Sequence, residues 1–362
     1  MESISGKDLY AMGEAQPTEF FRTVVEPLAD SFEPAQVELY ERLMEAWIPP
    51  APRVPPEIPA RVDAVFVLSR VTLGADIKIT SMVLDAMKKR FPDARVLFVS
   101  NAKSAELFAA DHRIEHLPAE YPRSGPVSAR VSFGHELRKR VEGPDRIVID
   151  PDSRMTQLGL IPACEPFHYF HFPSRVAGGK SLDNLTDLTG RWLRETFGVS
   201  GQAYIAPTKV TVEGARPWAA VNFGVGDNET KRVPGTFEAE LLRELSLKYA
   251  TLWVDRGAGG EEAIRVTTAS AGIENVRFWE GSFAGFASII AQSDLYAGYD
   301  SGGQHAAAAA GIPLLSIFAG APSKRFRHRW SPAGPAPCTI VNADATFAVR
   351  TLLAGNYDTH PS

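Results

Sequence analysis

The chain has 362 residues, of which 44% are hydrophobic and 22% charged, and its formal net charge is −5. This length allows two domains, and the composition is ordinary for a globular protein with a sizeable core. The negative net charge argues against a nucleic-acid partner, because no bulk positive field is present to meet the phosphates of a duplex. A local basic patch that binds a diphosphate stays open.

Only two cysteines are present, Cys164 and Cys338. They lie far apart and lack the spacing of a metal site, so we expect a reduced, cytoplasmic protein. No apolar run approaches the ~20 residues of a membrane span, and the N-terminus lacks the charged-then-apolar pattern of a secretion signal. Peripheral contact with the inner face of the membrane stays an open alternative.

The first 48 residues are predicted to form a helical segment that precedes the first strand. Two segments, 20–28 and 35–47, carry apolar residues at spacings of three and four. The proline-rich stretch 49–59 cannot continue a helix and predicts an extended linker. We therefore assign residues 1–60 to a helical N-terminal extension and its linker.

From residue 61 onward, strands and helices alternate. The first strand is the continuous apolar run 64–69, which is typical of a strand buried on both faces. The other elements of this half are expected at helix 77–91, strand 95–100, helix 104–110, strand 113–117, helix 128–141 and strand 146–150. This alternation favours a doubly wound parallel sheet, a Rossmann-like domain over residues 61–205.

The alternation restarts after a junction near residues 200–217. Strands are expected at 218–223, 251–255, 275–279, 295–298, 313–318 and 339–342, with helices at 236–249, 261–268 and 283–292. We therefore predict a second Rossmann-like domain over residues 206–345, followed by a tail at 346–362. In such α/β folds the ligand binds at the carboxyl ends of the strands, so we expect it between the two halves.

The most informative motif follows the strand 295–298. The chain continues through Asp300, Ser301 and Gly302 into a small-residue helix that carries His305 in its first turn. Backbone N–H groups at such a helix start face a bound phosphate, and glycine permits its close approach. The motif predicts a nucleotide-sugar or phosphate site. The alternative is a tight strand–helix turn whose alanines simply pack close to the sheet.

A second candidate group follows the first strand. Asp76 is a candidate general base, because it lies at the end of the first strand, with a helix N-cap as the alternative. Arg70 either binds an acidic group on a ligand or neutralises Asp76. Asp152 belongs to the Asp-Pro-Asp triplet that closes the fourth strand, at the same sheet edge as Asp76.

Basic residues supply the remaining candidates. Lys231 follows a loop that starts at Gly224 and includes Thr230, with room for a phosphate whose charge its ammonium would stabilise. A solvated lysine at a loop tip is the alternative. The basic run 324–329 predicts either an anion site or a charged surface loop. We expect no metal, because Cys164, His168 and His171 match no standard spacing.

Four stretches, in the same order along the chain, resemble glycosyltransferase family 9, the ADP-heptose:lipopolysaccharide heptosyltransferases with the two-domain GT-B fold. They are residues 68–76, with Arg70 and Asp76 at the family's separation; 222–232, a glycine-containing loop that ends in Lys-Arg; 300–305, Asp-Ser-Gly to His; and 329–334, Arg-Trp-Ser-Pro-Ala-Gly. The third stretch is the most specific. The resemblance covers residues 62–345 and leaves out the N-terminal extension.

Several family positions carry another residue here: Ala75, Val233, Ala284, Tyr299, Gly303 and Gln304. Tyr299 stands where the family usually has asparagine, and Val233 where it has tryptophan. Gly303 and Gln304 replace a Pro-Met pair. Because of these departures, we do not carry the family's usual donor and acceptor over to this chain.

The resemblance implies an inverting, metal-independent glycosyltransferase. It would move a heptose or other hexose-like sugar from a nucleotide-diphosphate sugar to a glycan or glycolipid acceptor of the lipopolysaccharide kind, without a cofactor. Asp76 and Lys231 would be catalytic, and Arg70 and Asp152 would bind the acceptor in the N-terminal domain. The donor-binding residues of the C-terminal domain would be Gly224, Thr230, Lys231, Asp300, Ser301, Gly302 and His305.

Two other functions stay open. A nucleotide-sugar epimerase of the GT-B type would turn over donor without an acceptor. A non-catalytic nucleotide-sugar-binding or scaffold protein on the same fold would bind without turnover. The extension could dimerise, cover the acceptor site or pack against the first domain, and no pattern indicates the oligomeric state.

Overall fold

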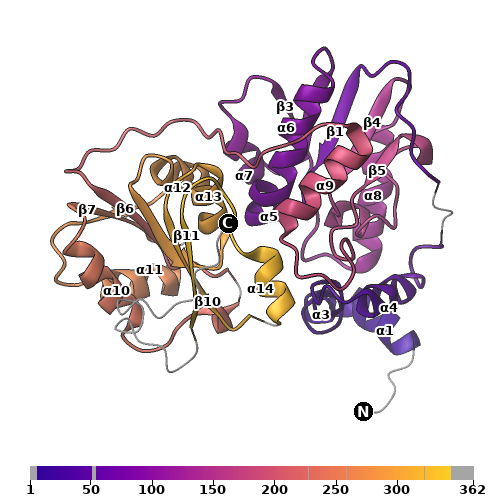
Figure 1. The fold of residues 1–362 in the computed structure, drawn as a ribbon. Coiled ribbons are helices and arrows are strands. Elements are labelled where there is room, and N and C mark those ends of the chain that lie inside the picture. Colours follow the sequence, from indigo (N-terminus) through magenta and orange to yellow (C-terminus); the bar gives the residue numbers. More distant parts are fainter. Residues whose placement is uncertain (1–5, 51–53, 227, 258, 322, 344–362) are drawn as a thin grey trace. The chain divides into compact units, whose positions relative to one another are not determined.

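The computed structural model describes residues 6–50, 54–226, 228–257, 259–321 and 323–343. It contains a 5-stranded and a 6-stranded sheet, both wholly parallel and flanked by helices (Figure 1). The predicted fold class, two Rossmann-like doubly wound domains after a helical N-terminal extension, is confirmed. The predicted tail at 346–362 and residues 51–53 of the predicted linker lie outside the described residues.

Contacts divide the chain into two compact units. The first comprises residues up to 105, 112–202 and 323–329, and the second comprises 106–111, 203–322 and the segment from 330 onward. Each unit therefore includes a short piece of chain that is distant from the rest of it in sequence.

The N-terminal extension consists of short helices that belong to the first unit. They are α1 (Gly6–Ala15), α2 (Pro17–Phe20), the π-helical turn η1 (Phe21–Val25), α3 (Glu26–Ala29) and α4 (Pro34–Met44). Their apolar faces form one buried cluster with side chains of the α/β part, so Phe20 and Met44 pack with Val127 and Ile161. The carboxylate of Glu14 accepts a hydrogen bond from the backbone N–H of Ser128, which caps the start of α8 (Val127–Val141) from outside that helix.

The first sheet has the strand order β3-β2-β1-β4-β5. Its strands are β1 (Ala64–Leu68), β2 (Arg95–Ser100), β3 (Ile114–Pro118), β4 (Arg146–Asp150) and β5 (Tyr169–His171). Its further helices are α5 (Leu73–Ala75), η2 (Asp76–Thr80), α6 (Ser81–Arg90), α7 (Ala102–Ala105) and α9 (Leu185–Phe197). Strand β5 and helix α9 were not predicted, because β5 has three residues and α9 lies in a stretch rich in polar residues.

The second sheet has the strand order β11-β10-β9-β6-β7-β8. Its strands are β6 (Trp218–Asn222), β7 (Thr251–Asp255), β8 (Val276–Trp279), β9 (Leu295–Tyr299), β10 (Leu314–Ala319) and β11 (Cys338–Ala343). Its helices are α10 (Phe237–Ser246), α11 (Gly260–Ala269), α12 (Phe283–Ile290) and α13 (Gly302–Ala309). Among the described residues, no helix is both long and apolar enough to cross a bilayer.

The basic run 324–329 forms a helix instead of a surface loop. This helix, α14 (Lys324–Trp330), was not predicted, and its residues 324–329 belong to the first unit. Its charged residues hide the helical pattern, because the most buried side chain in it is an arginine.

The strand order determines where the candidate residues lie in each sheet. In each sheet the chain first winds outward in one direction and then returns to start the other side, so the order reverses between β1 and β4 and between β6 and β9. Ligands of doubly wound sheets bind beyond the carboxyl ends of the strands at such reversal points. Arg70 and Asp152 follow β1 and β4, and Gly224 and Asp300 follow β6 and β9.

The buried cluster beneath the extension generates a prediction. Replacing Phe20 by alanine removes a fully buried ring, which is expected to destabilise the first unit by about 3–5 kcal/mol. Hydrogen–deuterium exchange of segment 20–44 should accelerate accordingly. The control is Leu39→Ala on α4, where the side chain is 44% exposed and its loss should leave exchange unchanged. Equal acceleration by both variants would mean that the extension is not anchored through this cluster.

Candidate active site

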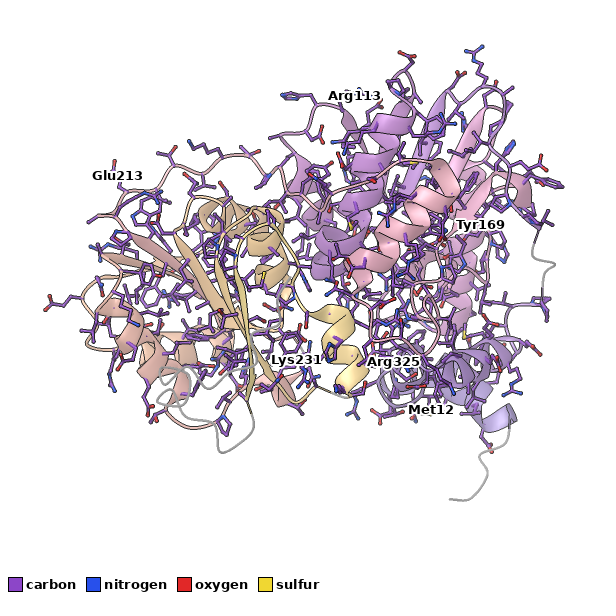
Figure 2. The ribbon with its side chains drawn as sticks, viewed as in Figure 1. Met12, Arg113, Tyr169, Glu213, Lys231 and Arg325 are labelled. Atoms are coloured by element: carbon purple, nitrogen blue, oxygen red, sulfur yellow. The ribbon has the colours of Figure 1, made fainter. Side chains whose placement is uncertain are left out.

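Asp300 is the centre of the candidate site in the second unit. Its carboxylate is buried after β9 and is bound at both oxygens. The Lys231 Nζ donates to Asp300 Oδ2 over 2.8 Å, and the Gln304 Nε2 donates to Oδ1 over 2.5 Å. The same ammonium lies 3.4 Å from the backbone oxygen of Asp300, so a positive charge stands at the end of β9 (Figure 2 labels Lys231).

Gln304 extends this arrangement into the sheet. It lies in the first turn of α13, is fully buried, and accepts a hydrogen bond through Oε1 from the hydroxyl of Ser316 on β10. Sequence reasoning noted Gln304 only as a departure from the family pattern. The available signal was a glutamine four residues after Asp300, surrounded by alanines, where a buried amide needs partners at both ends.

The start of α13 allows a ligand to approach the backbone N–H groups closely. Its N-cap residue, Ser301, makes no side-chain cap hydrogen bond, so the first N–H groups of the helix keep their capacity to donate. A Cβ at Gly303 would overlap with the hydroxyl of Tyr296, so only glycine fits there. Gly302 begins the helix, and His305 is buried in its first turn with its ring 6.0 Å from that of Trp330.

The loop after β6 presents Lys231 on a short turn, η6 (Glu229–Lys231). The Asn228 side chain accepts hydrogen bonds from the backbone N–H and the hydroxyl of Thr230, which caps this turn. Gly320, after β10, has a φ of +63°, and a Cβ there would overlap with the carbonyl oxygen of Thr230. The loop therefore lies directly against the end of β10.

The strand that leads into this loop carries a second polar pair. At its carboxyl end, Asn222 Nδ2 donates to Asp255 over 2.7 Å, and Asn222 Oδ1 accepts from the N–H of Gly224 over 2.9 Å. Burial raises the pKa of Asp255, although hydrogen bonds from Gly257 and Asn222 act in the opposite direction. The hydroxyl of Ser301 lies 3.5 Å from Asn222 Oδ1. Residues from β6, β7 and β9 therefore converge at one edge of the sheet.

In the first unit, Asp76 is enclosed. Its carboxylate has no exposed surface and accepts hydrogen bonds from the Ser69 hydroxyl (2.6 Å), the Arg70 backbone N–H (2.7 Å) and the Thr80 hydroxyl (2.9 Å). Burial raises its pKa even though these hydrogen bonds lower it. In this conformation Asp76 holds the turn after β1, and an acceptor hydroxyl does not reach it.

Arg70 and Asp152 lie together at the same sheet edge. Arg70 Nη1 donates to the Pro151 carbonyl (2.6 Å) and the Ser174 hydroxyl (2.5 Å), and it lies 3.9 Å from Asp152 Oδ2. Burial lowers the pKa of Arg70 to about 10. For Asp152, burial alone would raise the pKa, but Arg175, His171 and Arg70 outweigh it and hold that pKa well below its usual range.

Two functional candidates at this edge were missed. Arg175 Nη1 donates to Asp152 Oδ2 over 2.8 Å, and His171 Nε2 lies 3.5 Å from Asp152 Oδ1. Both residues line a small cavity that Tyr40 of the extension also borders. The backbone is strained beside it, with φ of +71° at Asp152, a conformation that non-glycine residues rarely adopt. Neither residue could be linked to Asp152 from sequence, because β5 was not predicted.

The hydrogen bonds around Gln304 generate a prediction. Gln304→Leu leaves the buried hydroxyl of Ser316 without its acceptor and frees one oxygen of Asp300, so we expect a loss of about 1–3 kcal/mol in the free energy of unfolding. Adding Ser316→Ala to this variant should recover part of the loss, since both partners are then apolar. Urea unfolding of the two single variants and the double variant measures the coupling, and strict additivity would contradict the hydrogen bond.

No protein-family model matches the chain, and no curated protein matches it in sequence. Solved structures do match it in fold. The glycosyltransferase family 9 protein of Veillonella parvula has a TM-score of 0.57 at 15% identity and covers 82% of this chain and 89% of its own. The E. coli heptosyltransferase WaaC with ADP-2-deoxy-2-fluoro heptose has a TM-score of 0.59 at 17% identity, covering 81% and 99%.

The structure of the E. coli ADP-heptose LPS heptosyltransferase II is a third match, with a TM-score of 0.53 at 18% identity over 77% of this chain and 90% of that one. At such identities a match shows the fold alone. The resemblance predicted from the four sequence stretches is therefore confirmed at the level of the fold: this chain has the fold of the family 9 heptosyltransferases.

Proposed function

We propose that this protein is a glycosyltransferase that moves a heptose or similar hexose-like sugar from a nucleotide-diphosphate sugar to a glycan or glycolipid acceptor. One observation carries the proposal: Lys231, Asp300 and the uncapped start of α13 meet at the β6–β9 reversal point. The solved structures that share this fold include heptosyltransferases, one of them with an ADP-heptose analogue.

The second unit is the donor side of this proposal. A diphosphate is bound by N–H groups at a helix start and by a nearby cation, and both are present at the start of α13. Gly224, Thr230 and Gly302 shape the backbone beside Lys231, while Ser301 and His305 supply polar atoms for the sugar and phosphates. Asp300 orients the ammonium of Lys231 until the diphosphate takes its charge.

The reaction forms one bond and breaks one bond. An acceptor oxygen attacks the anomeric carbon as the bond from that carbon to the diphosphate oxygen breaks, and the sugar inverts. The electron pair stays with the nucleoside diphosphate, where Lys231 offsets the new charge. The hydroxyl proton passes to a general base. We propose that no metal or other cofactor takes part.

The first unit is the acceptor side of this proposal, with Arg70 and Asp152 as binding residues. Asp76 is the base proposed from sequence, and it requires the turn after β1 to open, because its carboxylate is enclosed. His171 is a second candidate base, because it borders the cavity and lies beside an ionised Asp152. We place the protein in the cytoplasm, with acceptor contact at the inner face of the membrane.

Nucleotide binding is the first test. A ligand that binds only the folded state raises the melting temperature, so we expect one family of nucleoside diphosphates to stabilise the protein. Lys231→Met should abolish that shift. Lys248→Met is the matched control, because it removes an exposed lysine from the same unit. No response to any nucleotide would overturn the donor site, and loss of the shift in EDTA would overturn the metal-free proposal.

The identity of the base is a second test. Asp76→Asn keeps the shape of the side chain but removes its basicity, so transfer to a lipopolysaccharide-type acceptor should fall by about 100-fold or more while donor binding is kept. Thr80→Val is the control, because it removes a hydrogen bond to Asp76 but leaves the carboxylate. Release of nucleoside diphosphate measures the rate.

The outcomes of this second test separate the candidates. Equal losses in the Asp76→Asn and Thr80→Val variants would show that Asp76 only holds the turn, and a larger loss in His171→Gln would then assign the base to His171. Donor turnover without acceptor would indicate an epimerase. Binding without any turnover would indicate a scaffold protein.

A further inference from the structure

Two carboxylates in the turn between α3 and α4 form ion pairs with arginines of the same unit. Asp30 lies 3.3 Å from Arg175 and 3.6 Å from Arg154. Glu33 lies 2.8 Å from Arg325 on α14 (Figure 2 labels Arg325). The carboxylates are about half exposed while the arginines are largely buried, so the turn 30–33 covers the arginines from the solvent side.

Phe32 anchors this turn in a strained conformation. Its φ is +57°, the left-handed region that an aromatic residue rarely adopts. Its side chain is nevertheless only 1% exposed, with the ring 5.6 Å from the guanidinium carbon of Arg329 and 6.1 Å from the ring of Phe326. The Phe32 carbonyl also accepts a hydrogen bond from Arg325. Contacts with two arginines therefore hold the turn in place against its backbone strain.

Arg329 differs from the other arginines beside the turn 30–33 in its hydrogen bonding. It is completely buried, and within the described part of the chain none of its three guanidinium nitrogens has a hydrogen-bond partner. Burial, followed by the nearby charge of Arg325, lowers its pKa, and Asp183 acts in the opposite direction. A buried cation without hydrogen-bond partners is strongly unfavourable, so the Arg329 guanidinium is a candidate group for binding an anion.

The distribution of charged side chains around the turn supports an anion site at Arg329. Asp152 already has Arg70 and Arg175 as partners, and Asp30 adds a second carboxylate beside Arg175. At the other end of the turn, Glu33 pairs with Arg325, and within the described residues no carboxylate pairs with Arg329. The charge of Asp183 acts on the pKa of Arg329, but no guanidinium nitrogen of Arg329 has a hydrogen-bond partner among the described residues. The guanidinium fork fits the oxygens of phosphate or carboxylate in a bidentate manner.

We propose that Arg325 and Arg329 form a binding site for a phosphate-like oxyanion, and that the turn 30–33 is a built-in occupant that this anion displaces. On binding, the Glu33 carboxylate leaves Arg325 and the Phe32 ring leaves the face of Arg329, so the strained turn relaxes. The site uses none of the donor residues and lies wholly within the first unit. It goes beyond the proposed transfer reaction and assigns a role to the extension.

Inorganic phosphate is the probe, titrated into the full chain by calorimetry at constant ionic strength. We carry out the series in the Lys231→Met background, which removes the donor-site response. Arg329→Met should weaken phosphate binding by roughly tenfold or more, because a charge-assisted bidentate contact is lost. Lys324→Met is the matched control, since it removes an exposed charge from the same helix and should leave the affinity unchanged.

The competing carboxylate gives an independent reading. Glu33→Gln removes the occupant of Arg325 and should tighten phosphate binding by roughly two- to fivefold, the scale of a partly exposed ion pair. This variant keeps the proposal testable if Arg329→Met fails to fold. Acetate in place of phosphate tells a carboxylate site from a phosphate site. Equal phosphate affinity in the parent, Arg329→Met and Glu33→Gln proteins would overturn the proposal, whatever the outcome at the nucleotide site.

Discussion

A single buried carboxylate, that of Asp300, joins three elements of the second unit. Lys231 from η6 binds one of its oxygens, and Gln304 from α13 binds the other and is itself held by Ser316 on β10. Gln304 and the Ser316 hydroxyl are fully buried, so the loss of one partner there leaves a polar group without water to replace it. The loop, the helix start and the sheet are therefore fixed together, with a cation at the point where the α13 N–H groups begin.

In the first unit, several arginines are buried near one edge of the sheet, where a buried cation needs an ionised partner. Arg70 and Arg175 lie on either side of Asp152, so their guanidinium groups keep an ionised partner although they are out of water. The extension supplies the remaining carboxylates through its turn 30–33. Without the extension these arginines would face solvent or a ligand, and for this reason we regard the extension as part of the functional surface.

Two departures from the family pattern, Tyr299 and Gly303, have local structural reasons. Tyr299 is a core residue whose hydroxyl accepts from the Val233 N–H and whose ring lies near those of Phe223 and Phe237. Gly303 makes room for Tyr296, which a proline ring would not. At these two positions the contacts with neighbouring side chains account for the residue that is present.

The fold class, most strand positions and the approximate location of the Asp300 motif could be predicted from the amino-acid sequence, because buried parallel strands leave continuous apolar runs and phosphate-binding turns leave glycines. It did not reveal β5, α14 or the partners of Asp152. Those depend on contacts between residues up to 293 positions apart, as in the bond from Arg325 to Phe32. That Asp76 is enclosed, and that Arg329 has no hydrogen-bond partner among the described residues, became visible in the three-dimensional structure, because burial and pairing depend on neighbours in space and leave no local pattern in the chain.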